Sequence, residues 1–119
     1  MQPTFLPWIG YFDLIDKVDK FVFYDDVQLS KRSWQTRNKI RTREGEKLIS
    51  VPILKTKSRS NLFICDAKIS YDHKWKKKHL LIIEHNYSKS KYFREIFSFI
   101  ESIYQENFLS LSKFNQFSY

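Results

Sequence analysis

The stretch from Gln2 to Phe12 constrains the fold most tightly, because it contains two prolines only four positions apart. Pro3 and Pro7 fix their own φ angles and push the residues before them, Gln2 and Leu6, toward extended geometry. Pro7 also suits the first position of a helix, where a missing N–H costs nothing. The sequence therefore predicts a rigid loop that leads directly into a helix.

A short helix and then a buried strand are predicted after this loop. Apolar residues recur with helical spacing as far as Asp19, at Ile9, Phe12, Leu14, Ile15 and Val18. The run from Phe21 to Tyr24 is typical of a buried strand, and Asp25 and Asp26 end it. Ligands of open α/β sheets usually bind at this end of a strand.

Asp25 and Asp26 are therefore candidate catalytic residues. Adjacent side chains of an extended chain point to opposite faces, so the two carboxylates are not expected to form a close pair. One of them would hold a metal–phosphate complex or act as a base, and the other would be a turn or cap residue.

A β-hairpin is predicted in the middle of the chain. Residues from Gln35 to Thr42 alternate as in a strand, which places Gln35, Arg37, Lys39 and Arg41 on one face. Gly45 suits the position of the following loop that needs a positive φ, so residues 36–42 and 48–53 are expected to pair antiparallel. The remaining predicted segments are the return strand Leu48–Leu54, a polar basic loop over Lys55–Asn61 and a further strand over Phe63–Ile69.

Two to three helices are predicted in the last third of the chain. Asp72 is a suitable N-cap for the first, which runs to about Tyr87. Its apolar face is formed by Trp75, His79, Ile82, Ile83 and Asn86. A second helix covers about Lys91–Asn107, and a third begins at Ser110. The predicted fold class is α/β: an N-terminal loop, helix and strand, central antiparallel strands with a hairpin, and two to three C-terminal helices.

The composition indicates at most one domain. The 119 residues are 42% hydrophobic and 18% aromatic, which argues against disorder. The single Cys65 excludes an internal disulfide and a cysteine-based zinc site. No apolar run approaches the ~20 residues of a membrane helix, and the first apolar stretch is too short for a signal peptide. A cytoplasmic protein is expected, with no metal site predicted and the cofactor unassigned.

The net charge of +8 is concentrated in the middle of the chain. Residues 27–60 contain ten Lys or Arg and only two Glu. Within them, Arg32, Arg37 and Lys39 are candidate phosphate ligands. An arginine guanidinium can donate to two phosphate oxygens at once, and a lysine ammonium supplies a positive charge. The alternative is an ordinary solvated strand face. The same basic segment with Trp34 would also suit a nucleic-acid-binding module.

Gln2, Trp8 and Tyr11 are candidate ligand-binding residues near the start of the first predicted helix. The N–H groups of a helix N-terminus attract anions. The order of strand, loop and helix is also that of nucleotidyltransferases, but Trp8-Ile9-Gly10-Tyr11 stands where those proteins have His-x-Gly-His, so the likeness concerns layout alone. For Trp8 and Tyr11 the alternative is packing of the helix.

Several of these segments together resemble the WbqC-like protein family. The resemblance rests on Gln-Pro-x-Phe-Leu-Pro-Trp-x-Gly-Tyr-Phe from residue 2, Asp19-x-Phe21-Val22, Asp26-Val27-Gln28, and Arg37-Asn38-Lys39-Ile40, and it extends to about residue 95. Family members are roughly twice as long and usually have an apolar strand before the Gln-Pro. The resemblance therefore implies a single partial domain over residues 1–119, a fragment whose first strand and C-terminal half are absent.

The resemblance also implies a function. WbqC-like proteins are bacterial and are associated with O-antigen and other surface-polysaccharide biosynthesis, where transferase roles have been proposed. It implies a transferase-type protein acting on a phosphorylated or nucleotide-linked sugar, and it adds Gln28 and Asn38 to the ligand-binding candidates. The alternatives are the nucleic-acid module and a non-catalytic remnant.

Two geometric expectations follow. Arg37 and Lys39 should face the same cleft as Gln2, Trp8 and one of the two aspartates. Without a strand before Gln2, the Phe21–Tyr24 strand should have an open edge on one side, which would favour self-association.

Overall fold

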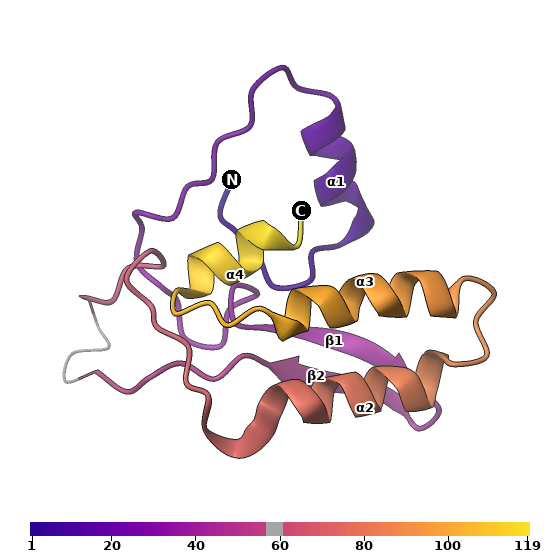
Figure 1. Cartoon of the computed structure of the whole chain (residues 1–119). Coiled ribbons are helices and arrows are strands. Elements are labelled where there is room, and N and C mark those ends of the chain that lie inside the picture. The colour runs from indigo at the N-terminus through magenta and orange to yellow at the C-terminus, as the bar shows by residue number, and fades with distance from the viewer. Residues whose placement is uncertain (57–60) are drawn as a thin grey trace.

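Two helices lie against a β-hairpin in the computed structural model, which describes residues 1–56 and 61–119 (Figure 1). Within these residues there are four α-helices and one two-stranded sheet. The elements in chain order are α1 (Ile9–Asp16), β1 (Arg37–Thr42), β2 (Gly45–Ser50), a 3₁₀ turn (Asp72–Lys74), α2 (Trp75–Tyr87), α3 (Phe93–Gln105) and α4 (Leu111–Phe117). The mixed α/β class expected from the sequence is confirmed.

The hairpin has the predicted antiparallel pairing. Its register runs from Arg37 opposite Ser50 to Thr42 opposite Gly45, so Arg43 and Glu44 alone form the tip. Gly45 has a φ of 116°, as predicted. The return strand is Gly45–Ser50 instead of Leu48–Leu54. Residues 57–60 of the predicted polar loop lie outside the described residues.

The core lies between the hairpin, α2, α3 and α4. Its buried members are Phe5, Ile49, Val51, Ala67, Ile69, Trp75, Ile103, Tyr104, Leu111 and Phe114. The predicted face of α2 is the buried one, with Trp75, His79 and Ile83 almost fully enclosed. α3 begins at Phe93 and ends at Gln105, inside its predicted limits, and Ser110 caps α4 by accepting from the N–H of Lys113.

Asp72 is not the N-cap of α2, contrary to the prediction. The chain kinks after it, because His73 and Lys74 have φ angles of 68° and 48°, and α2 begins only at Trp75. The Asp72 carboxylate instead accepts a hydrogen bond from the Ser70 hydroxyl at 3.1 Å.

The first helix differs from the prediction in its ends and in the residue that it buries. α1 begins at Ile9, after Pro7, and ends at Asp16 instead of Asp19. Tyr11 is its buried residue, whereas Ile9 is 85% exposed. In Figure 1, α1 stands above the other elements. The helical spacing of apolar residues therefore predicted the helix correctly, but the apolar face of this helix is not buried.

The Phe21–Tyr24 segment forms no strand, which corrects the prediction. The terminal amine of Met1 donates to the Val22 carbonyl and the Tyr24 N–H donates to the Met1 carbonyl, both at 2.8 Å. These bonds have the spacing of a parallel ladder, but one residue is too short a partner to make a strand. In the described part of the chain no backbone bond joins Phe21 or Phe23 to another segment. Self-association through this edge stays a prediction.

The predicted strand Phe63–Ile69 is also wrong. A turn interrupts it, in which the N–H groups of Asp66 and Ala67 bond to the carbonyls of Phe63 and Ile64. Isolated bridges remain, between Gln28 and Phe63 and between Ile53 and Ile69. No described helix is long and apolar enough to cross a membrane.

Candidate functional site

A cavity of about 550 Å³ lies between the N-terminal loop and the start of β1. It is lined by Met1, Gln2, Thr4, Pro7, Trp8, Tyr11, Trp34, Gln35 and Asn38. None of the side chains in this set carries a formal charge at neutral pH. We call it the amide–indole pocket, after its three carboxamides and two tryptophans.

Two hydrogen-bonded glutamines form part of the pocket wall. Gln35 is buried, and its Nε2 donates a short hydrogen bond to Gln2 Oε1. Gln35 Oε1 is also buried and has no partner within the described residues. An unpaired buried acceptor costs free energy.

Tyr11 holds Gln2 from the other side. Its hydroxyl donates to the Gln2 carbonyl at 2.8 Å. Burial, followed by the neighbouring Tyr119, raises the pKa of Tyr11 well above its ordinary value. The hydroxyl therefore stays protonated at neutral pH and serves as a permanent donor.

Asn38 fastens the N-terminal loop to β1. Its Nδ2 donates to the carbonyls of Phe5 at 3.1 Å and Leu6 at 2.6 Å. The Phe5 N–H donates to the Trp34 carbonyl at 2.9 Å, which ties the two segments a second time. These contacts set the distance between the two sides of the pocket.

Two tryptophans form the exposed walls. Trp8 is 67% exposed and Trp34 is 53% exposed. Trp8 is the N-cap residue of α1, and its side chain makes no capping hydrogen bond. Large aromatic side chains left open beside a polar pocket provide flat apolar surface for a ligand ring.

The structure brings four of the predicted site residues together, Gln2, Trp8, Tyr11 and Asn38, and leaves Arg37 and Lys39 outside the pocket. Neighbours in a strand point to opposite faces, so Arg37 and Lys39 lie on the face opposite Asn38. Lys39 forms an ion pair with Glu46 at 2.7 Å. Arg37 Nε is buried and has no partner among the described residues. The single cleft expected from the sequence is therefore not found, because Arg37 and Lys39 do not line this pocket.

The two aspartates also lie elsewhere. The Asp25 carboxylate accepts hydrogen bonds from the Ser112 hydroxyl and, at 3.3 Å, from Gln116 Nε2. It thus holds α4, which is a structural contact, while Asp26 is exposed. No cluster of His, Cys, Asp or Glu in residues 1–56 and 61–119 could hold a metal ion.

The remaining predicted residues occupy two further places. Gln28 lies in the isolated bridge with Phe63. Arg32, whose φ is 56°, lines a separate cavity of about 300 Å³ with Ser30 and Thr36. The ligand-binding role of both stays a prediction.

Sequence reasoning missed Gln35 as a site residue. Strand alternation assigned it to the basic face with Arg37, but β1 begins only at Arg37, so alternation does not extend back to Gln35. Its partner Gln2 is 33 residues away, and no local pattern could have indicated this contact. For Trp34 the sequence predicts a role only in the nucleic-acid alternative.

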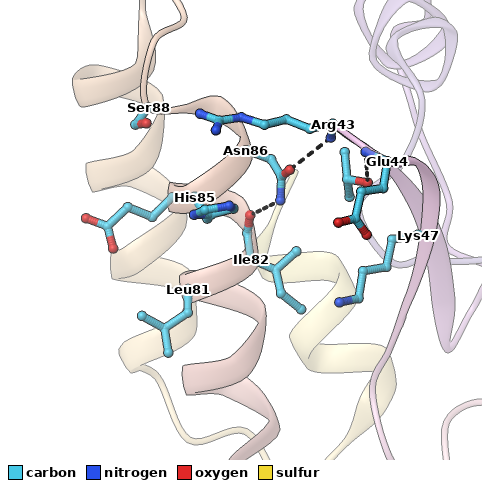
Figure 2. Close-up of a pocket in the computed structure, with 10 residues that line it drawn as sticks. Arg43, Glu44, Lys47, Leu81, Ile82, His85, Asn86 and Ser88 are labelled. Carbon is cyan, nitrogen blue, oxygen red and sulfur yellow. Dashed lines mark hydrogen bonds between the residues drawn. The ribbon is translucent and has the colours of Figure 1, made fainter.

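A larger open cavity of about 920 Å³ lies between the hairpin tip and α2 (Figure 2). The Asn86 carboxamide bridges the two elements, because Oδ1 accepts from the Arg43 N–H at 3.2 Å and Nδ2 donates to the Ile82 carbonyl at 2.7 Å. Figure 2 shows Lys47 and Glu44 on the hairpin wall of this cavity. Charges of both signs line this cavity, so it favours no particular class of ligand.

Comparison with sequence families finds a match to the WbqC-like protein family over residues 2–119. The match continues past residue 95, where the resemblance was expected to end. Among curated proteins, the uncharacterised protein Rv1507c of Mycobacterium tuberculosis is 40% identical over 117 residues. The aligned region is 98% of this chain and 50% of that relative, so the chain spans about half the relative's length. No solved structure matches significantly.

Proposed function

Because the chain belongs to the WbqC-like protein family, we propose that it binds a sugar for a transferase-type step of bacterial surface-polysaccharide biosynthesis, such as that of O-antigen. The proposed ligand is a phosphorylated or nucleotide-linked sugar, and the proposed location is the cytoplasm. The transferase role rests on the family resemblance, and the sugar-binding role rests on the amide–indole pocket.

The observation that carries the proposal is the set of uncharged side chains that line this pocket. Carboxamides both donate and accept hydrogen bonds, as the hydroxyl groups of a sugar do. Gln2, Gln35 and Asn38 provide three of them around a cavity of about 550 Å³, which is large enough for a sugar ring. The exposed rings of Trp8 and Trp34 offer apolar surface to the C–H faces of such a ring.

The charge pattern supports a ligand whose anionic part extends beyond the pocket. Residues 27–60 contain ten Lys or Arg and two Glu, and a basic surface raises the local concentration of phosphorylated ligands. The pocket would then bind the sugar, and the phosphate groups would extend beyond it into solvent, where the positive net charge of the chain attracts them.

Isothermal titration of the chain with UDP-glucose, as a representative nucleotide sugar, tests the proposal. Saturable one-to-one binding is expected. Replacing Trp34 by Ala should weaken it about tenfold, because one stacking surface is lost. The matched control is Tyr92→Ala, another exposed aromatic residue, which lies at the start of α3 and outside the pocket. Gln35→Leu is a second variant, and its thermal melting curve shows whether it stays folded.

A parallel titration with polyuridylic acid addresses the nucleic-acid alternative. Binding that is tight only to the polyanion and falls steeply with salt concentration would contradict the sugar proposal. Equal affinity of Trp34→Ala, Gln35→Leu and the unaltered chain for UDP-glucose would also contradict it.

A further inference from the structure

Gly10 is the second residue of α1, and its side-chain position is occupied by the indole of Trp8. A Cβ placed on Gly10 would lie 1.8 Å from Trp8 Cζ3, 1.9 Å from Cη2 and 2.6 Å from Cε3. No pair of carbon atoms comes this close without a covalent bond. The six-membered ring of the indole therefore lies where any larger residue would need to put its side chain.

The backbone does not explain the glycine. Gly45 is the glycine with a positive φ, and Gly10 is not in the left-handed region. A glycine inside a helix is also less favourable than an alanine, because it loses more conformational freedom on folding. The requirement at position 10 is thus space for the ring of Trp8.

The contact determines where one wall of the amide–indole pocket stands. Trp8 is 67% exposed, so the ring rests on Gly10 while much of its surface remains open to solvent. A side chain held in one position before binding loses less conformational entropy when a ligand arrives. We propose that Gly10 is a positioning residue, which holds the Trp8 indole as the flat wall on which a ligand sugar ring stacks.

This inference rests on the proposed function, and Gly10→Ala tests it. The atoms in the way belong to an exposed side chain that can rotate, so the helix should accept alanine and Trp8 should move. The affinity for UDP-glucose is expected to fall about tenfold. Ile9→Ala is the matched control, because Ile9 is the preceding residue of the same helix and is 85% exposed. It should leave the affinity unchanged.

A double-mutant cycle separates a role through Trp8 from a general effect on α1. Trp8→Ala alone should weaken binding as much as Gly10→Ala does. If Gly10 acts only through Trp8, adding Gly10→Ala to Trp8→Ala should cause no further loss. An additional loss in the double variant would overturn the inference.

A spectroscopic measurement follows Trp8 directly. The chain has three tryptophans, so 5-fluorotryptophan labelling gives three ¹⁹F resonances, and Trp8→Phe identifies that of Trp8. Gly10→Ala should shift the Trp8 resonance and leave that of the buried Trp75 unchanged. An unmoved Trp8 resonance, or unchanged affinity in Gly10→Ala, would overturn the role of Gly10 alone. Failure of the unaltered chain to bind UDP-glucose would overturn the proposed function, and the stacking role with it.

Discussion

Two regions of the molecule use apolar residues in opposite ways. In the helix–hairpin core, formed by β1, β2, α2 and α3, the apolar face of α2 buries Trp75 and Ile83. In the N-terminal arm, residues 1–24, Phe5 joins the core, but α1 has a comparable number of apolar residues and buries only Tyr11. The difference shows that periodicity makes a helix amphipathic, while a neighbouring element is needed to bury its apolar face.

The amide–indole pocket lies at the boundary between these regions. Gln2, Trp8 and Tyr11 come from the N-terminal arm, whereas Gln35 lies just before β1 and Asn38 lies within it. The hydrogen bonds of Asn38 to the carbonyls of Phe5 and Leu6 join the two sides. For a substitution in either region, the free energy of unfolding and the affinity for a ligand of the pocket can therefore be measured separately.

The largest expected effect is loss of the central aromatic residue of the core. Trp75 is 5% exposed, its Nε1 donates to the Ser70 carbonyl at 2.8 Å, and its ring contacts those of Tyr104 and Phe114. Trp75→Ala should lower the free energy of unfolding by about 3–5 kcal/mol, measured by urea denaturation. Phe12→Ala on the half-exposed face of α1 is the control and should cost less than about 1 kcal/mol. Equal losses would contradict the comparison.

Acid should lower the free energy of unfolding through His79, which is buried in the core and not in the arm. Burial lowers the pKa of His79 from 6.5 to about 4, and its Nδ1 lies 3.1 Å from the Tyr104 hydroxyl. Between these pH values the unfolded chain binds the proton and the folded chain does not. The free energy of unfolding is therefore highest above pH 6.5. It falls by on the order of 2–3 kcal/mol as the pH drops toward 4.

Urea denaturation at pH 7, 5 and 4 measures this loss. His79→Gln cannot titrate in this range, so its stability should fall less between pH 7 and pH 4 than that of the unaltered chain. If both lose the same free energy, other groups cause the acid sensitivity.

A smaller effect is expected at the contact of α4 with Asp25, the residue that follows the arm. Asp25→Ala leaves the Ser112 hydroxyl and the Gln116 amide without their acceptor, and should cost about 1–3 kcal/mol. The neighbouring Asp26→Ala removes an exposed carboxylate and should change the stability by no more than about 0.5 kcal/mol. Thermal denaturation of the two variants distinguishes them. If they are equally stable, the structural role assigned to Asp25 is wrong.

The smallest effect is expected at the exposed ion pair of the hairpin. Lys39 and Glu46 are 2.7 Å apart, with side chains 53% and 70% exposed. Solvent and salt screen such pairs, so Lys39→Ala should change the free energy of unfolding by at most about 0.5 kcal/mol. If the same variant instead abolishes binding of UDP-glucose, the phosphate-binding role of this residue gains its first direct support.

Elements specified by neighbouring residues could be predicted from the sequence. Strand alternation and a single glycine predicted the hairpin around Gly45, helical spacing predicted α2 and α3, and Ser110 marked the start of α4. Turn geometry and capping depend on bonds between residues a few positions apart. The sequence alone therefore determined the fold class and much of the element order.

Tertiary structure alone decided which residues share the pocket. The pairing of Gln2 with Gln35 joins positions 33 residues apart, and the anchoring of Asp25 by Ser112 joins positions 87 residues apart. The exposed face of α1 and the position of Gln35 in the pocket also depend on which elements pack together and on where β1 begins. Local patterns determine which backbone conformations are favourable, but the contacts of a side chain are determined by the segments that the whole fold brings beside it.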